Sequence, residues 1–121
     1  MRYMLLVRGD PEASLPEERF PEAFTDWVEC TRAMREAGIL LDGDALHPSD
    51  GAGTVRARGG SAVVTDGPFA ETKEMLLGYY LVEVASHEEA LAWARRLPCV
   101  DWGAVEVRMI QDSPAGGRAE G

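Results

Sequence analysis

At 121 residues the chain is long enough for one domain and too short for a second core. Its net charge is −9, and its single lysine, Lys73, leaves no basic cluster to offset repulsion from phosphate backbones, so we expect no direct nucleic-acid binding. No apolar run approaches the ~20 residues that span a bilayer, and the first apolar stretch is too short for a signal peptide. These features predict a cytoplasmic protein that does not bind membranes.

The two cysteines, Cys30 and Cys99, lie far apart in the chain, and neither has a C-x-x-C partner. With two histidines scattered elsewhere, no zinc-site spacing exists, and no phosphate-loop, dinucleotide-binding or hydrolase motif is present. We therefore expect free thiols, no metal and no cofactor.

The first predicted strand covers residues 3–7, an apolar run that ends at Gly-Asp-Pro. The helix after it has Pro21 in its opening turn and Gly38 at its end. Apolar residues at steps of three and four predict one core-facing side of this helix, made of Phe20, Phe24, Trp27, Val28, Thr31 and Met34.

The next predicted strand covers residues 39–41, and Asp-Gly-Asp at 42–44 leads from it into a loop. Residues 54–58 and 61–65 flank a Gly-Gly dipeptide, which is typical of a two-residue hairpin turn. Residues 76–84 form a further strand that is rich in apolar groups on both faces.

A second helix follows, and its start is marked by the capping-box spacing of Ser86 and Glu89. Its apolar stripe consists of Ala90, Leu91, Ala94 and Leu97, and Pro98 ends it. Residues 104–110 alternate again and predict the last strand.

The predicted order of strand, helix, strand, hairpin, strand, helix, strand indicates an α+β fold, a ferredoxin-like split βαβ with an inserted hairpin. We expect one domain over residues 1–111 and a disordered tail over residues 112–121, which has nothing to bury. Both helices are expected on one face of the sheet. The doubly apolar strand at 76–84 predicts that a second copy covers the other face, giving a homodimer.

The segment at 63–74, with Asp66-Gly67-Pro68-Phe69 at its centre, and the later Gly78-Tyr79-Tyr80 resemble the DGPF-type branch of the YCII-related proteins. The resemblance extends over nearly all of residues 1–110. It implies a subunit of a dimeric α+β barrel. It also implies a link to transcription regulation, because family members are often found beside, or fused to, sigma factors of the extracytoplasmic-function type. The wider YCII group is associated with a His–Asp active-site pair, which neither histidine here matches by motif.

The Asp-Gly-Pro-Phe segment supports two interpretations, a structural turn and a ligand-facing loop. In a turn, Asp bonds the backbone ahead, Gly supplies a positive φ and Pro fixes the exit. The residues after it carry two carboxylates and the lysine, which a turn does not need. The candidate ligand-binding residues are Asp66, Gly67, Pro68, Phe69, Glu71, Lys73, Tyr79 and Tyr80.

Tyr79 and Tyr80 should point to opposite faces of their strand, so packing in the core or in a dimer competes with ligand binding for each. Asp66 and His47 are the candidate catalytic acid–base groups, and a solvated loop position is the competing interpretation of His47. The first function considered is a non-enzymatic homodimer that binds a small molecule or a partner such as a sigma factor. The second is a cofactor-free enzyme that acts on a small polar substrate in a cleft at the Asp66 loop.

Overall fold

The computed structural model describes residues 1–10, 18, 20–46, 52–67, 75–101 and 103–111. The element order is β1 (Arg2–Gly9), α1 (Phe20–Glu36), β2 (Leu40–Ala45), β3 (Gly53–Arg58), β4 (Ser61–Asp66), β5 (Met75–Glu83), α2 (His87–Arg95), the 3-10 helix η3 (Pro98–Asp101) and β6 (Gly103–Met109). This order confirms the predicted succession of elements. The predicted tail at 112–121 lies outside the described residues. Within the described part, no helix is long and apolar enough to cross a membrane.

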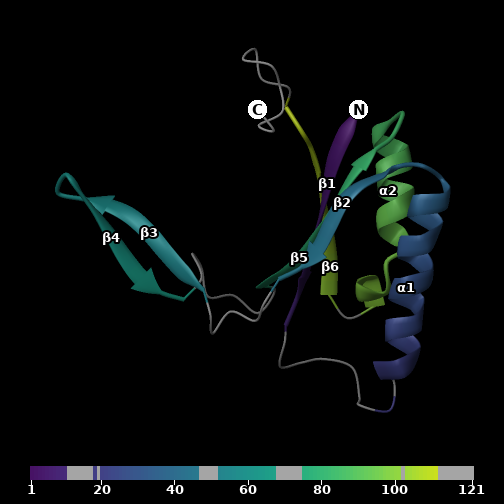
Figure 1. Ribbon diagram of the computed structural model, residues 1–121, viewed down its shortest axis with the longest axis horizontal. Helices are drawn as coiled ribbons and strands as arrows, with labels where there is room; N and C mark the ends of the chain where they lie inside the picture. Colours follow the sequence, from purple (N-terminus) through teal and green to yellow (C-terminus); the bar gives the residue numbers. More distant parts are fainter. Residues whose placement is uncertain (11–17, 19, 47–51, 68–74, 102, 112–121) are drawn as a thin grey trace.

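Four strands form the main sheet in the order β2-β5-β1-β6, with β1 and β5 at its centre. Each neighbouring pair in this sheet is antiparallel. Figure 1 shows α1 and α2 together on one face of the sheet. The arrangement is that of a ferredoxin-like split βαβ, so the predicted α+β fold is confirmed.

The core lies between this sheet and the two helices. Strand β1 alternates strictly, with Tyr3, Leu5 and Val7 buried and the residues between them half-buried. The buried side chains that meet them come from the helices, β5, η3 and the turn before η3, and include Cys30, Met34, Val82, Ala90, Ala94, Leu97 and Cys99. The half-buried residues of β1 point to the opposite face, called the open face below.

Helix α1 buries a narrower stripe than its sequence predicts. Cys30 and Met34 are buried and Trp27 packs against them, but Phe24 is 70% exposed and Val28 is 44% exposed. The prediction that Phe24 and Val28 belong to the core-facing side was therefore wrong. With about 3.6 residues per turn, these two residues lie on the flank of the stripe centred on Trp27 and Met34.

Strand β2 runs further than predicted, because Asp42, Gly43 and Asp44 are paired with β5 and are not a loop. Asp42 lies opposite Leu81 and Asp44 lies opposite Tyr79. The ladder of hydrogen bonds along β5 holds this polar segment extended despite its weak intrinsic preference for strand.

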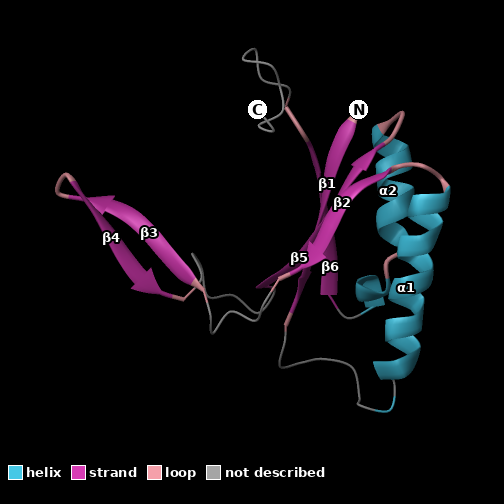
Figure 2. Cartoon of the chain, in the orientation of Figure 1, coloured by secondary structure: helices cyan, strands magenta, loops and turns pink. Residues whose placement is uncertain are grey.

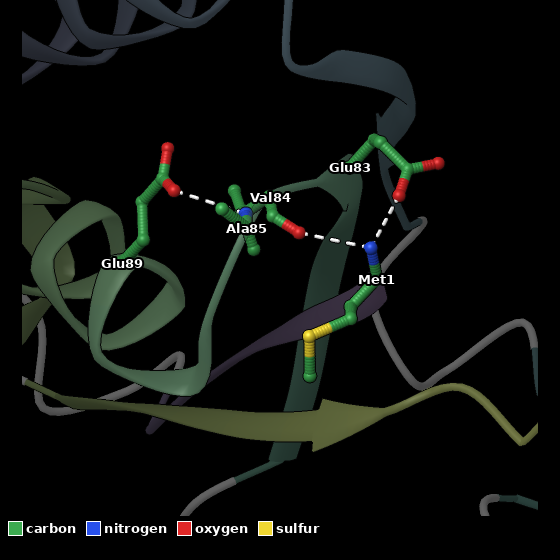
Figure 3. Close-up of polar contacts among 5 residues, drawn as sticks. All are labelled: Met1, Glu83, Val84, Ala85 and Glu89. Atoms are coloured by element: carbon green, nitrogen blue, oxygen red, sulfur yellow. Dashed lines mark hydrogen bonds and ion pairs between the residues drawn. The ribbon is translucent and has the colours of Figure 1, made fainter.

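The start of α2 and the start of β1 are tied to the end of β5 (Figure 3). The backbone N–H of Glu89 donates to Ser86 Oγ at 3.1 Å, which confirms the predicted N-cap, and the Glu89 carboxylate accepts from the backbone N–H of Ala85 at 3.0 Å. The Met1 amino group donates to the carbonyl of Val84 at 2.9 Å and to the Glu83 carboxylate at 2.5 Å. These contacts hold the start of β1 and the start of α2 beside the end of β5.

Strands β3 and β4 form a separate two-stranded sheet. Gly59 and Gly60 connect them with φ values of 58° and 85°, which confirms the predicted hairpin turn and requires residues that tolerate positive φ. Figure 2 shows this hairpin standing away from the main sheet, on the side opposite the helices.

Candidate functional site

A pocket of about 490 Å³ lies between α1 and the main sheet, at the end where β2 finishes and β5 begins. Helix α1 contributes Phe24, Trp27 and Thr31 to its wall. The sheet contributes residues from three strands, among them Val7, Gly43, Leu77, Gly78 and Tyr80. The wall is therefore mainly apolar and aromatic, with a few polar groups, as is typical of small-molecule sites.

Two aromatic rings and a threonine organise the wall. The Trp27 and Tyr80 rings stack with centroids 6.1 Å apart and an interplanar angle of 23°. The hydroxyls of Tyr80 and Thr31 lie 2.8 Å apart. The Thr31 hydroxyl also donates to the carbonyl of Trp27 at 2.8 Å. A hydroxyl has one proton to donate, so Tyr80 is the donor in the Tyr80–Thr31 bond.

This assignment leaves acceptor capacity on the Tyr80 oxygen. Burial raises the pKa of Tyr80, and the hydrogen bond with Thr31 opposes the rise to a smaller extent. The phenol therefore stays neutral at pH 7, with its proton committed to Thr31. The Tyr80 oxygen can therefore accept a hydrogen bond from an N–H or O–H group of a ligand.

In the floor of the pocket, the strands β2 and β5 lie close together at two glycines, Gly43 and Gly78. A Cβ atom added at Gly43 would lie 2.9 Å from Tyr80 Cδ1 and 3.0 Å from the carbonyl oxygen of Tyr79. A Cβ added at Gly78 would lie 2.9 Å from the carbonyl oxygen of Asp44. Because Gly43 has no side chain, the Tyr80 ring can lie over β2 in the position that it takes in the wall.

The residues predicted from the Asp-Gly-Pro-Phe segment are only partly described. Asp66 is exposed at the end of β4, and Gly67 after it has a φ of 97°. The Gly67 N–H donates to the carbonyl of Ala52 at 2.7 Å, and its carbonyl accepts from the Thr54 hydroxyl at 2.9 Å. These bonds give Gly67 a structural role at the base of the hairpin.

Asp66 and Gly67 are not among the described residues that line the pocket. The other candidates from this segment (Pro68, Phe69, Glu71 and Lys73) and the loop residue His47 lie outside the described residues. A ligand site at the Asp66 loop therefore stays a prediction.

Tyr79 and Tyr80 lie on opposite faces of the sheet, as predicted. Tyr80 faces α1, whereas the Tyr79 hydroxyl donates to the Asp42 carboxylate at 3.2 Å on the open face. Desolvation, then the carboxylates of Asp42 and Asp44, raise the pKa of Tyr79. Both tyrosines are among the residues that line the pocket, and Tyr80 is the one whose hydroxyl is hydrogen-bonded to Thr31 of α1.

No motif in the sequence marks Trp27 and Thr31 as functional candidates. Their spacing of four residues placed them on the inner side of α1, but the same spacing is typical of ordinary core residues. Within the described residues, no group of three or more His, Cys, Asp or Glu side chains gathers where it could hold a metal ion.

Known proteins similar to this chain include a relative and a solved structure, each covering more than nine-tenths of it. The chain is 39% identical over 114 residues to a Rhizobium meliloti (strain 1021) protein named Uncharacterized protein R00369, covering 91% of this chain and 92% of that protein. Its fold is similar to that of 5-chloro-2-hydroxyhydroquinone dehydrochlorinase from Burkholderia phenoliruptrix AC1100, solved in complex with 2,5-dihydroxybenzoquinone. That match has a TM-score of 0.55 at 13% identity and covers 96% of this chain and 99% of the other.

The family model of the YCII-related domain matches residues 1–113. This range contains all the described helices and strands, including the inserted hairpin. The resemblance seen in the sequence is thereby confirmed at the level of the family. The chain belongs to the YCII-related domain family.

Proposed function

We propose that this protein is a cytoplasmic homodimer that binds a small, planar, largely apolar molecule carrying a hydrogen-bond donor. The observation that carries the proposal is the pocket of about 490 Å³ with the stacked Trp27–Tyr80 pair in its wall. Small-molecule sites commonly have volumes of roughly 300–1,000 Å³ and few polar groups. Aromatic walls favour flat ligands, because rings stack with an offset on rings.

The Tyr80 hydroxyl supplies specificity in this proposal. The Tyr80 hydroxyl donates its hydrogen bond to Thr31, so its oxygen is left to accept a hydrogen bond from the ligand. A hydroxylated ring fits both requirements. The bound 2,5-dihydroxybenzoquinone in the enzyme of similar fold has this chemistry and is a suitable first probe.

The experiment that tests the proposal is a thermal-unfolding titration with 2,5-dihydroxybenzoquinone, and with toluene as an apolar ring without a donor. Binding to the folded state raises the melting temperature in proportion to the logarithm of ligand concentration. We expect the hydroxylated ring to stabilise the wild type more than toluene does, and Tyr80→Phe to remove the difference. The proposal is wrong if neither probe stabilises the wild type, or if Trp27→Ala and Tyr80→Phe respond as the wild type does.

The homodimer is proposed from the charge pattern of the open face. One row across the sheet runs Asp42, Leu81, Met4 and Arg108, from β2 to β6. A two-fold axis parallel to the strands would place Asp42 over Arg108 of the partner subunit and Leu81 over its Met4. An axis perpendicular to the strands would place acidic β2 over acidic β2. Because like charges at close range are costly, this row favours the parallel axis. In the next row (Asp44, Tyr79, Leu6 and Glu106) the same axis sets Asp44 over Glu106, whose charge is offset by its hydrogen bonds from Arg8 and Arg108.

The same axis would close the two four-stranded sheets into one barrel, in agreement with the dimeric α+β barrel that the family resemblance implies. Sedimentation equilibrium at micromolar concentration should give about twice the chain mass of 13.2 kDa. Asp42→Lys should weaken the dimer, and adding Arg108→Asp to it should restore part of the loss. A monomeric wild type would contradict this part of the proposal.

The alternative function is a cofactor-free enzyme that uses Asp66 or His47 as acid–base group at the Asp66 loop. The similarity in fold to a dehydrochlorinase favours testing it. Binding without turnover is preferred, because no polar or charged side chain is fully buried among the described residues and Asp66 is exposed. Turnover of a hydroxylated ring by the wild type, lost in Asp66→Asn, would reverse this preference.

A link to sigma factors of the extracytoplasmic-function type is the regulatory part of the proposal, and it rests on the family resemblance alone. The purified protein should bind such a sigma factor from the same cell, and the ring ligand should change the affinity. Equal affinity for an unrelated sigma factor would contradict the regulatory part of the proposal. It would not bear on the proposed small-molecule site.

A further inference from the structure

The pocket beside α1 is larger than one aromatic ring requires. Its volume is about 490 Å³, whereas an apolar cavity of roughly 150 Å³ already holds benzene. A single hydroxylated ring in contact with Tyr80 would leave most of this volume to water against an apolar wall, which is unfavourable. The volume therefore indicates a ligand that has a second apolar part besides its ring.

The α1 wall of the pocket extends over about two turns of the helix. Phe24, Trp27 and Thr31 line it, and Thr31 follows Phe24 by seven residues. With a rise of 1.5 Å per residue, seven residues span about 10 Å along the helix axis. The hydroxyl of Thr31 is at one end of this wall, and the ring of Phe24 is at the other.

The β5 wall has a similar length and the same polarity. Leu77 and Tyr80 line it three positions apart, which is about 10 Å along a strand. Figure 1 shows α1 and β5 running in the same direction. Since Tyr80 is hydrogen-bonded to Thr31 at one end, Leu77 lies toward the Phe24 end. Both walls therefore place hydroxyls at one end of the pocket and apolar side chains at the other.

The apolar end of the pocket is its mouth. Phe24 is 70% exposed, and two further lining residues from β2, Asp44 and Ala45, are also exposed. Thr31 and Tyr80 are half-buried, so their hydroxyls lie deeper. A ring whose hydroxyl bonds to Tyr80 would direct a group on its opposite side toward Phe24. Burial of that group would cover part of the exposed Phe24 ring.

We infer that the ligand is a para-substituted phenol, with its hydroxyl donating to the Tyr80 oxygen and an apolar chain extending to Phe24. The inference rests on the proposed function and deepens it, because it adds an apolar chain to the hydroxylated ring. In this arrangement Phe24 sets the preferred length of the chain. The arrangement also gives a role to an apolar helix residue that stays exposed in the free protein.

Isothermal titration calorimetry with phenol, 4-ethylphenol and 4-butylphenol tests the inference on the full chain. Each methylene that is buried should raise the affinity about fourfold. The positional control is 2-butylphenol, which has the same atoms as 4-butylphenol but carries its chain beside the hydroxyl, away from the mouth. It should bind roughly tenfold more weakly than 4-butylphenol, because less of its chain is buried.

Phe24→Ala identifies the residue that meets the chain. It should weaken the binding of 4-butylphenol roughly tenfold and leave the binding of phenol unchanged. Its melting temperature should match that of the wild type, because the Phe24 side chain is mostly exposed. The matched control is Val28→Ala, since Val28 is also exposed on α1 but is not among the described residues that line the pocket. This control should bind every phenol as the wild type does.

The outcomes separate the chain of the ligand from the site itself. A rise in affinity from phenol to 4-butylphenol that Phe24→Ala reduces and Val28→Ala does not supports the inference. Equal affinities for the three phenols, equal affinities for the two butyl isomers, or the same rise in Phe24→Ala as in the wild type overturns it. In each of those cases, phenol binding that weakens in Tyr80→Phe leaves the proposed function standing. If no compound of the series binds the wild type, both are overturned.

Discussion

The Tyr80 hydroxyl lies 2.8 Å from the Thr31 hydroxyl, and this contact joins the strand β5 to the helix α1 across the wall of the pocket. The two residues are 49 positions apart in the chain. Since Thr31 donates its own proton to Trp27, the three residues form a chain of hydrogen bonds with a fixed direction. In the proposed function, that direction favours ligands that donate a hydrogen bond to the Tyr80 oxygen.

The first prediction concerns this hydrogen bond. Tyr80→Phe keeps the ring but removes the hydroxyl, and it should lower the free energy of unfolding by about 1 kcal/mol, the usual net worth of a part-buried hydrogen bond. Thr31→Val should cost a similar amount, and the double variant should cost less than the two added together. Urea unfolding measures all three. Additive losses would show that the two hydroxyls are not coupled.

The second prediction concerns Gly43, in the floor of the pocket. Gly43→Ala places a methyl group against the Tyr80 ring and the Tyr79 carbonyl, and overpacking of this kind costs about 1–3 kcal/mol. Gly53→Ala is the matched control, because a Cβ there meets its nearest atom at 3.8 Å. Thermal unfolding should show a lower melting temperature for Gly43→Ala alone. Equal melting temperatures for the two variants would contradict the close approach.

The third prediction is a loss of stability in alkaline solution. Burial raises the pKa of Cys99 from 9.0 to about 11. Below pH 9 the thiol is protonated in both states; between pH 9 and 11 it ionises in the unfolded chain first, so stability falls as pH rises. The loss between pH 8.5 and 10.5 should be about 2 kcal/mol from this group.

Cys99→Ala provides the control for this pH dependence. It removes the titrating thiol, so its free energy of unfolding should fall less steeply over the same pH range. Part of the slope should remain, because burial also raises the pKa of Cys30 and of Tyr80. Identical slopes for the wild type and the variant would exclude Cys99 as a source.

The fourth prediction separates folding from function at the Asp66 loop. Asp66 is exposed, and Asn can make the same turn bonds, so Asp66→Asn should leave the melting temperature unchanged. If the carboxylate contacts a ligand, the variant should bind that ligand more weakly than the wild type does. A variant that melts several degrees lower and binds normally would show that Asp66 is a structural residue.

The sequence by itself determined the features that depend on neighbouring residues. The alternation of β1, the capping contact between Ser86 and Glu89, and the Gly59-Gly60 turn are local, because each is fixed by the conformations and side chains of a few adjacent positions. The order of these elements was enough to indicate the fold, and the residues at 63–74 and 78–80 indicated the family.

Only the tertiary structure decided which residues are paired in the sheet and which faces are buried. Asp42-Gly43-Asp44 has loop-forming residues, yet its hydrogen bonds with β5 make it a strand, because a sheet neighbour outweighs a weak local preference. Phe24 satisfies the helical pattern but stays exposed, since the rotation of α1 on the sheet sets which flank is buried. The pocket arises from the same cause: Trp27, Thr31 and Tyr80 meet through packing of α1 on β5, and no spacing in the sequence encodes a contact between residues so far apart.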